Sequence, residues 1–350
     1  KKRYNLKNRK INNSVKKNKN NKIIFLEKKT KTIKTFSGNI TVDKDLIINN
    51  PVKIEKGTVF SILPNKHIIF KNTVIAKGDA NNPIIFKKFN PENADNSQIK
   101  PWGSVVLMGK KTKDSFFDHV KFQGGSGGWH EQFYFTSMFS IHNTNDIKIL
   151  NSNFSSNEIY DDTIHIVYSK NVILKNIKIS DSYADAIDID ISKNIYIDNL
   201  NILSAVNDGI DFMESIAELN NVKVFNSKDK ALSIGENSSV IIKNSEFLNN
   251  KIGVAIKDKS KAKIYDSIFD DNDIQIAGYA KNWRYSGGGN IAIFKSIFSS
   301  SKKNYFITTG DPNDPTTVAD NDLIQNSSIN IFNSDIKGRT EKKGNNILIH

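Results

Sequence analysis

The sequence predicts an all-β fold in which short parallel strands stack into a solenoid. The main observation is a repeat, because six successive segments between residues 139 and 273 align as coils of 21 to 24 residues. Each coil holds two or three short runs in which β-branched residues alternate with polar ones, separated by Asn, Ser, Asp and Gly. Such runs are typical of strands that are too short to be stable alone, and a fixed repeat lets neighbouring coils bury them together.

Two columns of residues support the register of the coils. An amide recurs at one coil position, and side chains of this kind can hydrogen-bond along a stack. An apolar residue recurs shortly after it, which fills the interior of a solenoid. The amide column is Asn151, Asn176, Asn199, Asn221 and Asn244, followed by Asp266, and the apolar column is Phe154, Ile179, Ile202, Val224, Phe247 and Phe269.

Composition excludes several classes of protein. With 350 residues, of which 38% are hydrophobic, the chain can build a substantial core, so disorder over its whole length is excluded. No run of about 18 apolar residues is present, which excludes a membrane-spanning helix. The absence of cysteine excludes a disulfide scaffold, a thiolate zinc site, an iron-sulfur cluster and a cysteine nucleophile.

The net charge of +13 belongs to the N-terminal head. The first 35 residues hold 14 Lys or Arg and one acid, whereas the remainder holds 36 basic and 36 acidic residues. The head has low complexity and no apolar period, so we expect residues 1–35 to form a solvated basic tether. Attraction to an anionic polymer or a membrane surface is the alternative for the head. No reader motif indicates sequence-specific nucleic-acid binding.

The segments NNPVKIEKGTVFSILPN and AKGDANNPIIFKK look like the entry coils of secreted β-helices, and DAIDID, NDGIDF, DKALSIGENS and IGVAIKDKS are similar to coils of secreted bacterial β-helix proteins. The chain therefore resembles the right-handed parallel β-helix proteins, which include pectate lyases and related polysaccharide-active enzymes. The resemblance implies a single β-helix domain over residues 36–350 and an extracellular or cell-surface location, although Lys1 is not followed by an export signal. We expect a monomer.

Three segments interrupt the repeat and are expected to project as loops. Residues 123–139 and 278–290 combine glycines with aromatic residues, and residues 310–320 form a polar excursion with two prolines. Loops on one face of a solenoid commonly bind ligands. The substrate-binding candidates in these loops are Trp129, His130, Trp283, Arg284 and Tyr285, which can stack on sugar rings or contact acid groups.

Carboxylates recur on one outward face of the coils. In the segment AIDIDIS the isoleucines face the interior, so Asp188 and Asp190 face outward. The alignment predicts an outward column of Ser140, His165, Asp188, Asp211, Ser233 and Ala255, and a turn column of Asp162, Asp185, Asp208 and Lys230. Small residues between them predict a shallow trough: Thr163, Ala186, Gly209, Ala231 and Gly253.

The acidic cluster predicts a cation site. Rungs lie about 4.8 Å apart, so the five carboxylates repel one another unless they take up protons or bind a cation. An all-oxygen set suits Ca²⁺. The predicted ligands are Asp162, Asp185, Asp188, Asp208 and Asp211. Hydrogen bonding to the backbone of turns is the structural alternative for the turn members of this set.

In the β-helix polysaccharide lyases that this chain resembles, calcium neutralises a uronate carboxylate and a Lys or Arg removes the acidified proton. The resemblance implies Lys230 as the base, because Lys230 enters the acid column one rung beyond Asp208. His165 and Asp211 complete the expected catalytic set. An ion pair with Asp208 is the alternative role for Lys230. The outer substrate-binding positions are Asp190, Glu236 and Lys257, with the loop residues above.

Three functions stay open at this point. The first is calcium-assisted β-elimination on an acidic polysaccharide. The second is glycoside hydrolysis by paired Asp residues, which requires carboxyl groups about 5 to 5.5 Å or 6.5 to 9.5 Å apart. The third is a non-catalytic module that binds carbohydrate or serves adhesion. No nucleophile elbow, phosphate-binding loop or dinucleotide fingerprint is present, and the motifs of pectin hydrolases are missing.

Overall fold

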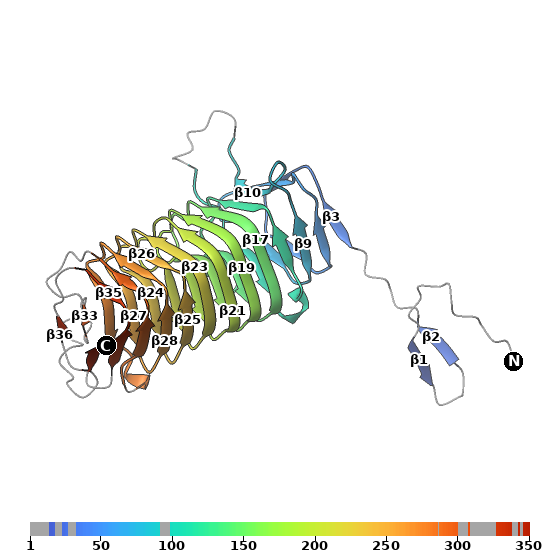
Figure 1. Ribbon diagram of the computed structural model, residues 1–350. Helices are drawn as coiled ribbons and strands as arrows, with labels where there is room; N and C mark the ends of the chain where they lie inside the picture. Colours follow the sequence, from blue (N-terminus) through green and yellow to red (C-terminus); the bar gives the residue numbers. More distant parts are fainter. Residues whose placement is uncertain are drawn as a thin grey trace.

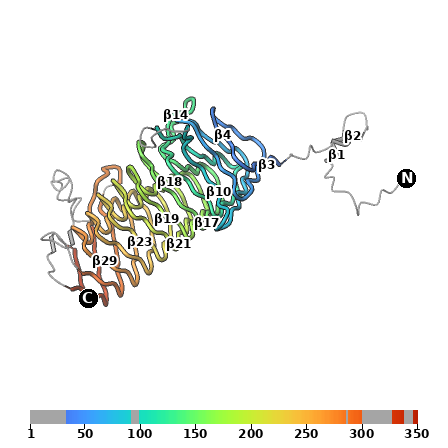
Figure 2. The backbone as a smooth tube through the Cα atoms, turned by 90° about the horizontal axis from the view of Figure 1, so that it is seen from above, coloured from blue at the N-terminus to red at the C-terminus, as the bar shows by residue number. Residues whose placement is uncertain are grey.

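The computed structural model is a parallel β-helix whose coils stack along one axis (Figures 1 and 2). It describes residues 14–17, 23–26, 33–91, 99–285, 287–299, 307–308, 327–337, 342–343 and 346–350. Nearly all strand pairs in the body are parallel, as short strands from successive coils require. In the described part of the chain, no helix is long and apolar enough to cross a membrane.

Among the described residues, the first large sheet has twenty-one strands and covers most of the coil wall. Its strands alternate buried and exposed residues. They are β3 (Lys34–Phe36), β4 (Asn39–Val42), β6 (Val52–Ile54), β7 (Val59–Ile62), β9 (Val74–Lys77), β10 (Ile84–Lys88), β12 (Phe116–Asp118), β13 (Val120–Gln123), β17 (Asn145–Ser155), β19 (Lys170–Ser180), β21 (Lys193–Ile202), β23 (Ile216–Phe225), β25 (Ser239–Lys243), β26 (Glu246–Leu248), β28 (Lys261–Tyr265), β29 (Ile268–Asp270), β31 (Asn290–Phe294), β32 (Ile297–Phe298), β34 (Ser328–Phe332), β35 (Asp335–Ile336) and β37 (Ile347–Ile349).

The second large sheet has twelve strands among the described residues and carries the predicted acid columns. Its strands are β5 (Leu46–Ile48), β8 (Ile68–Phe70), β11 (Val105–Met108), β16 (Ser137–His142), β18 (Asp162–Val167), β20 (Ile187–Asp190), β22 (Ile210–Met213), β24 (Lys230–Gly235), β27 (Ile252–Lys257), β30 (Ile274–Tyr279), β33 (Ile307–Thr308) and β36 (Lys342–Lys343). Short 3₁₀ turns lie at η3 (Lys110–Thr112) and η4 (Trp283–Tyr285).

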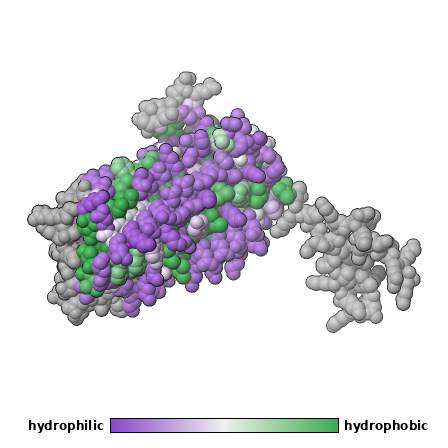
Figure 3. Space-filling model, in the orientation of Figure 1, coloured by the Kyte–Doolittle hydropathy of each residue, from purple (hydrophilic) through white to green (hydrophobic). Residues whose placement is uncertain are grey.

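The interior of the coils is apolar and stacked. The predicted apolar column is confirmed, since its members pair in register and are buried. The N-terminal coils add a stack of phenylalanine rings, in which Phe60, Phe86, Phe122 and Phe154 follow one another with centroids 4.7 to 4.8 Å apart. The face shown in Figure 3 is largely hydrophilic with scattered hydrophobic patches. Inside, one cluster of buried apolar residues runs from Phe36 to Ile331.

The predicted amide ladder is present and lies within strands β17, β19 and β21. Asn176 donates to Asn151 at 2.7 Å and Asn199 donates to Asn176 at 2.9 Å. Each of these asparagines has a positive φ, which Asn tolerates better than most residues. The ladder shifts at its last step, where Asn244 donates to Asn220 at 2.8 Å.

A buried serine ladder accompanies the amide ladder, and we did not predict it. The backbone N–H of Ser169 donates to the hydroxyl of Ser192 at 3.0 Å, and the same bond links each serine to the next. The ladder continues through Ser215, Ser238 and Ser260. The recurring Ser at one coil position was the available sequence signal.

The β-helix begins at β3, which pairs with β6. In the basic head, β1 (Ser14–Lys17) and β2 (Ile23–Leu26) pair antiparallel. The rest of residues 1–32 lies outside the described residues, so the tether stays a prediction. The predicted loop at residues 310–320 lies entirely outside them as well.

Candidate functional site

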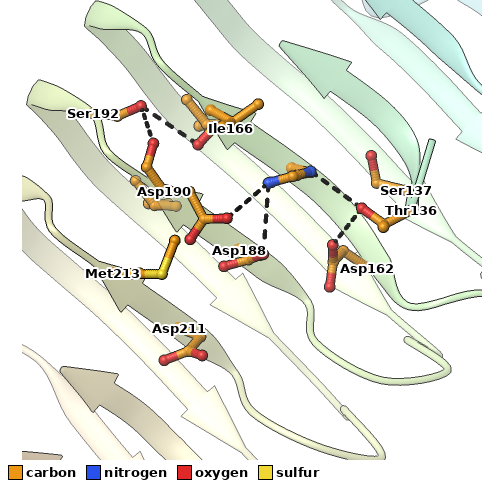
Figure 4. Close-up of polar contacts among 12 residues, drawn as sticks. Thr136, Ser137, Asp162, Ile166, Asp188, Asp190, Ser192, Asp211 and Met213 are labelled. Atoms are coloured by element: carbon orange, nitrogen blue, oxygen red, sulfur yellow. Dashed lines mark hydrogen bonds and ion pairs between the residues drawn. The ribbon is translucent and has the colours of Figure 1, made fainter. Parts of the chain in front are cut away.

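The outward column of the twelve-stranded sheet has the predicted register. Ser140 pairs with His165, His165 with Asp188, and Asp188 with Asp211. Asp211 is followed in register by Ser233 and Ala255, as expected. Figure 4 shows Asp162, Asp188 and Asp211 on successive strands, with their side chains on the same side of the sheet.

His165 is held among acidic groups. Its Nε2 lies 3.2 Å from Oδ2 of Asp190 and 3.6 Å from Oδ2 of Asp188. Its Nδ1 lies 3.1 Å from the hydroxyl of Thr136, which also donates to Asp162 at 3.0 Å (Figure 4). Sequence reasoning missed Thr136, because a single Thr in a loop gives no signal of its partner. The contact places the end of the 123–139 loop against the site.

The turn aspartates Asp185 and Asp208 hydrogen-bond to the backbone, which is the structural alternative expected for them. Oδ1 of Asp185 accepts from the backbone N–H of Asp208 at 2.7 Å and from Nδ2 of Asn207 at 2.7 Å. In the next coil, Oδ1 of Asp208 accepts from the backbone N–H of Lys230 at 2.9 Å. Each aspartate thus ties its own coil to the following one. These bonds use Oδ1, so the second oxygen of each carboxyl is available for another ligand.

Burial makes ionisation of the aspartates unfavourable. It raises the pKa of Asp185 to about 8, and the charges of Asp208 and Asp211 add to the rise. Burial, then the charges of Asp161 and Asp185, raises the pKa of Asp162 well above 3.8. The pKa of Asp188 is raised in the same way, by burial and then by the charges of Asp162 and Asp190. At neutral pH these carboxyls therefore favour a bound proton or a bound cation.

Within the expected patch, the five aspartates belong to two sets of close ligand atoms. Asp162, His165 and Asp188 have ligand atoms within 4.8 Å of one another, and we call them the histidine group. Asp185, Asp208 and Asp211 meet the same limit, and we call them the three-aspartate group. Only oxygen donors are present in the three-aspartate group, so its chemistry fits Ca²⁺, which binds six to eight oxygens. The imidazole makes the histidine group less suited to calcium.

Lys230 forms the ion pair that was expected as its alternative role. Its ammonium contacts Asp229 and lies 3.4 Å from Asp208, and the side chain is buried. Burial by itself lowers the pKa of Lys230, but the charges of Asp208 and Asp229 outweigh burial and raise it above the usual value. In this environment Lys230 keeps its proton.

The small residues between the two columns do not form the predicted trough. They are buried, and a Cβ built on Gly209 would lie 2.6 Å from Cγ1 of the core residue Val224. The turn before each strand directs this position inward, so small residues are required for packing. The residues concerned are Thr163, Ala186, Gly209, Ala231 and Gly253.

The 278–290 loop contacts the edge of the site. The hydroxyl of Tyr285 donates to Glu214, which follows β22. Trp283 is 80% exposed, and the guanidinium of Arg284 lies 5.8 Å from its ring centroid. Lys257, at the end of β27, is 4% exposed.

Burial also affects Glu236, which follows β24. Burial raises the pKa of Glu236, and the charge of Lys257 opposes that rise. Glu236 and Lys257 thus lie within electrostatic reach of each other on the same face.

The 123–139 loop contains a hairpin of β14 (Gly128–His130) and β15 (Phe133–Phe135). Nδ1 of His130 lies 2.7 Å from Asp45, away from the acid groups, so His130 anchors the loop. Trp129 is exposed and its ring lies 4.9 Å from that of Tyr134, which in turn packs against Tyr160. These aromatic rings lie at the coil that precedes β18.

Comparisons with known proteins agree with the fold. A family model described as the right handed beta helix region matches residues 137–335, which confirms the predicted hand of the solenoid. The A-module of a mannuronan C-5 epimerase of Azotobacter vinelandii shares 10% identity over 89% of this chain and 87% of that chain, with a TM-score of 0.58.

Two further solved structures are similar. The catalytic unit of an α-1,3-glucanase of Streptomyces thermodiastaticus shares 9% identity over 91% of this chain and 60% of that one, with a TM-score of 0.53. A periplasmic alginate epimerase shares 9% identity over 90% and 79% of the two chains, with a TM-score of 0.52. At these identities the likeness concerns the fold. No curated protein sequence matches the chain.

Proposed function

Because the chain belongs to the right-handed β-helix family, we propose that it is an extracellular, monomeric enzyme that cleaves an acidic polysaccharide by calcium-assisted β-elimination. The observation that carries the proposal is the position of His165, whose Nε2 lies 3.2 Å and 3.6 Å from two carboxylates on an accessible face. A merely structural solenoid has no need for an imidazole between partly exposed acids. The names of the similar structures, which refer to alginate and α-1,3-glucan, support a glycan as the substrate class.

His165 takes the proton from the carbon next to the acid group of the sugar. Asp190, whose Oδ2 lies 3.2 Å from Nε2, is placed to hydrogen-bond the ring as it takes the proton. The electron pair of the C–H bond becomes the new C=C bond while the glycosidic C–O bond breaks. The leaving oxygen takes a proton from Asp188, whose pKa is raised by burial. Each proton thus has a donor and an acceptor within the histidine group.

The carboxylate of the substrate needs positive charge beside it, because neutralisation acidifies the neighbouring C–H bond. Calcium held by the three-aspartate group, Asp185, Asp208 and Asp211, supplies such charge when it is bound. Lys230 adds a fixed charge to the same face, since its ion pairs keep it protonated. We therefore assign the proton transfer to His165 and an electrostatic role to Lys230.

The test is an assay for the unsaturated uronate, which absorbs in the ultraviolet. Pectate, alginate and glycosaminoglycans are screened with calcium and with a chelator. We expect product on one of them in calcium, and a loss of about 10²- to 10⁴-fold in His165→Ala. Asp188→Asn, which removes the proposed proton donor, should lower the activity. Its matched control is Asp198→Asn, in β21 of the twenty-one-stranded sheet, which should keep full activity.

Lys230→Gln separates the two roles of this lysine. An electrostatic role predicts a raised KM with residual turnover, whereas a loss of turnover equal to that of His165→Ala would make Lys230 the base. The other functions give different results in the same screen. Reducing ends without the ultraviolet signal indicate hydrolysis by paired aspartates, and binding without any product indicates a carbohydrate-binding module.

A further inference from the structure

Between β8 and β30, one outward row of the twelve-stranded sheet is accessible at three successive positions only. His165, Asp188 and Asp211 are partly exposed. Every other member of the row from β8 to β30 is 0% exposed. The row runs in register through Ile69, Val106, Ser140, His165, Asp188, Asp211, Ser233, Ala255 and Ala277. At about 4.8 Å per rung, the accessible part spans roughly 10 Å along the axis.

The hairpin of β14 and β15 closes the N-terminal end of this compartment (β14 is labelled in Figure 2). Phe135 is buried against Ile69 and Val106, which point outward from β8 and β11. His130 pairs with Asp45, next to the first strand of the sheet. The hairpin therefore covers the outer face of the sheet up to the coil that precedes His165.

Lys257 closes the C-terminal end. Its Cε lies 3.1 Å from the position that a Cβ on Gly235 would occupy, so the side chain lies flat over Gly235. Gly235 is in register with Met213, which borders the accessible part. Burial raises the pKa of Asp208 and the charges of Lys230 and Lys257 oppose the rise, so the Lys257 ammonium is within electrostatic reach of the three-aspartate group.

The Lys257 side chain is buried, yet its ammonium forms no ion pair with any residue that the structure describes. The charge of Lys257 acts on Glu236 and on Asp208 without an ion pair to either. A carboxylate of the substrate is an anion that the proposed reaction brings to this site, and the ammonium can donate a charge-assisted hydrogen bond to it.

We infer that the compartment accepts the end of an acidic glycan chain, with the carboxylate of a terminal sugar at Lys257. A chain that ran along the axis would collide with the hairpin on one side and with Lys257 on the other. The enzyme therefore acts from a chain end and releases a short product. The substrate class in this inference rests on the proposed function, whereas the closure of the compartment does not.

The closure can be tested without a substrate, because the chain has no cysteine. Single variants Ser140→Cys, Met213→Cys and Ser233→Cys are treated with a small maleimide. We expect the thiol at position 213 to react at least about 10-fold faster than the thiols at the two walls, since reactivity follows exposure. Equal rates at all three positions would overturn the inference. Melting temperatures of the variants check that each one is folded.

The mode of action is tested on whichever polymer gives product in the ultraviolet screen. A chain-end enzyme releases one short product from the first time point, and its rate at equal mass rises as the polymer is shortened. Lys257→Met should raise KM at least about 10-fold with a smaller change in kcat, and Lys257→Arg should restore part of the binding. Early long oligomers with a rapid fall in viscosity would overturn the inference and leave the proposed function intact. Absence of product on every polymer would overturn the proposed function. The maleimide rates would still show whether the compartment is closed at both ends.

Discussion

Replacing Asp185 by Asn should remove a pH dependence of stability that the wild type shows. The folded-state pKa of Asp185, about 8, lies above its ordinary value of 3.8. Between these two values the folded protein holds a proton that the unfolded chain releases, so stability falls as pH rises through this window. One such proton corresponds to about 1.4 kcal/mol per pH unit, or about 6 kcal/mol across the window.

The Asn side chain keeps the oxygen that accepts from the Asp208 backbone and from Asn207, so the variant preserves the link between coils. Urea unfolding is measured at pH 4, 5, 6, 7 and 8 in chelator for both proteins. We expect equal free energies of unfolding at pH 4 and a widening advantage of the variant above it. Parallel pH profiles for the two proteins would refute the reasoning.

The stabilisation by calcium can be compared between the wild type and Asp185→Asn. At pH 8 the wild type should gain stability on addition of calcium, because a ligand that binds only the native state stabilises it. Asp185→Asn should gain less, since one carboxylate of the three-aspartate group is lost. An equal gain in both proteins would place the cation elsewhere on the chain.

Three further predictions concern the solenoid itself. Deletion of residues 1–32, which ends before β3, should leave the melting temperature of the body unchanged, and a large fall would show that the head caps the stack. Asn176→Ala removes two ladder hydrogen bonds and should lower the free energy of unfolding, measured in urea, by about 2 kcal/mol. Asn153→Ala, at an exposed position, is the control and should leave the free energy of unfolding almost unchanged. Gly209→Ala should lower it by about 1 to 3 kcal/mol, because the new Cβ would lie 2.5 Å from a backbone oxygen, whereas Gly278→Ala, with its nearest atom at 3.4 Å, should be tolerated.

The sequence alone determined the stack of parallel strands and the register of its columns. Repeats of nearly constant length place residues such as Asn176 and Asn199, or Asp188 and Asp211, at equivalent coil positions, and parallel pairing then sets them side by side. The alternation of side chains along a strand decided which of these face outward. Both rules act over a few residues, so they can be applied without coordinates.

Only the tertiary structure decided what these positions contact. The turn geometry directs Gly209 inward and decides which aspartates bring their ligand atoms close together. Loops that return from distant sequence supply Thr136 to His165 and Tyr285 to Glu214. Burial and close partners keep Lys230 protonated. Contacts and burial of this kind depend on where separate segments meet in space, which the repeat pattern of a single coil does not encode.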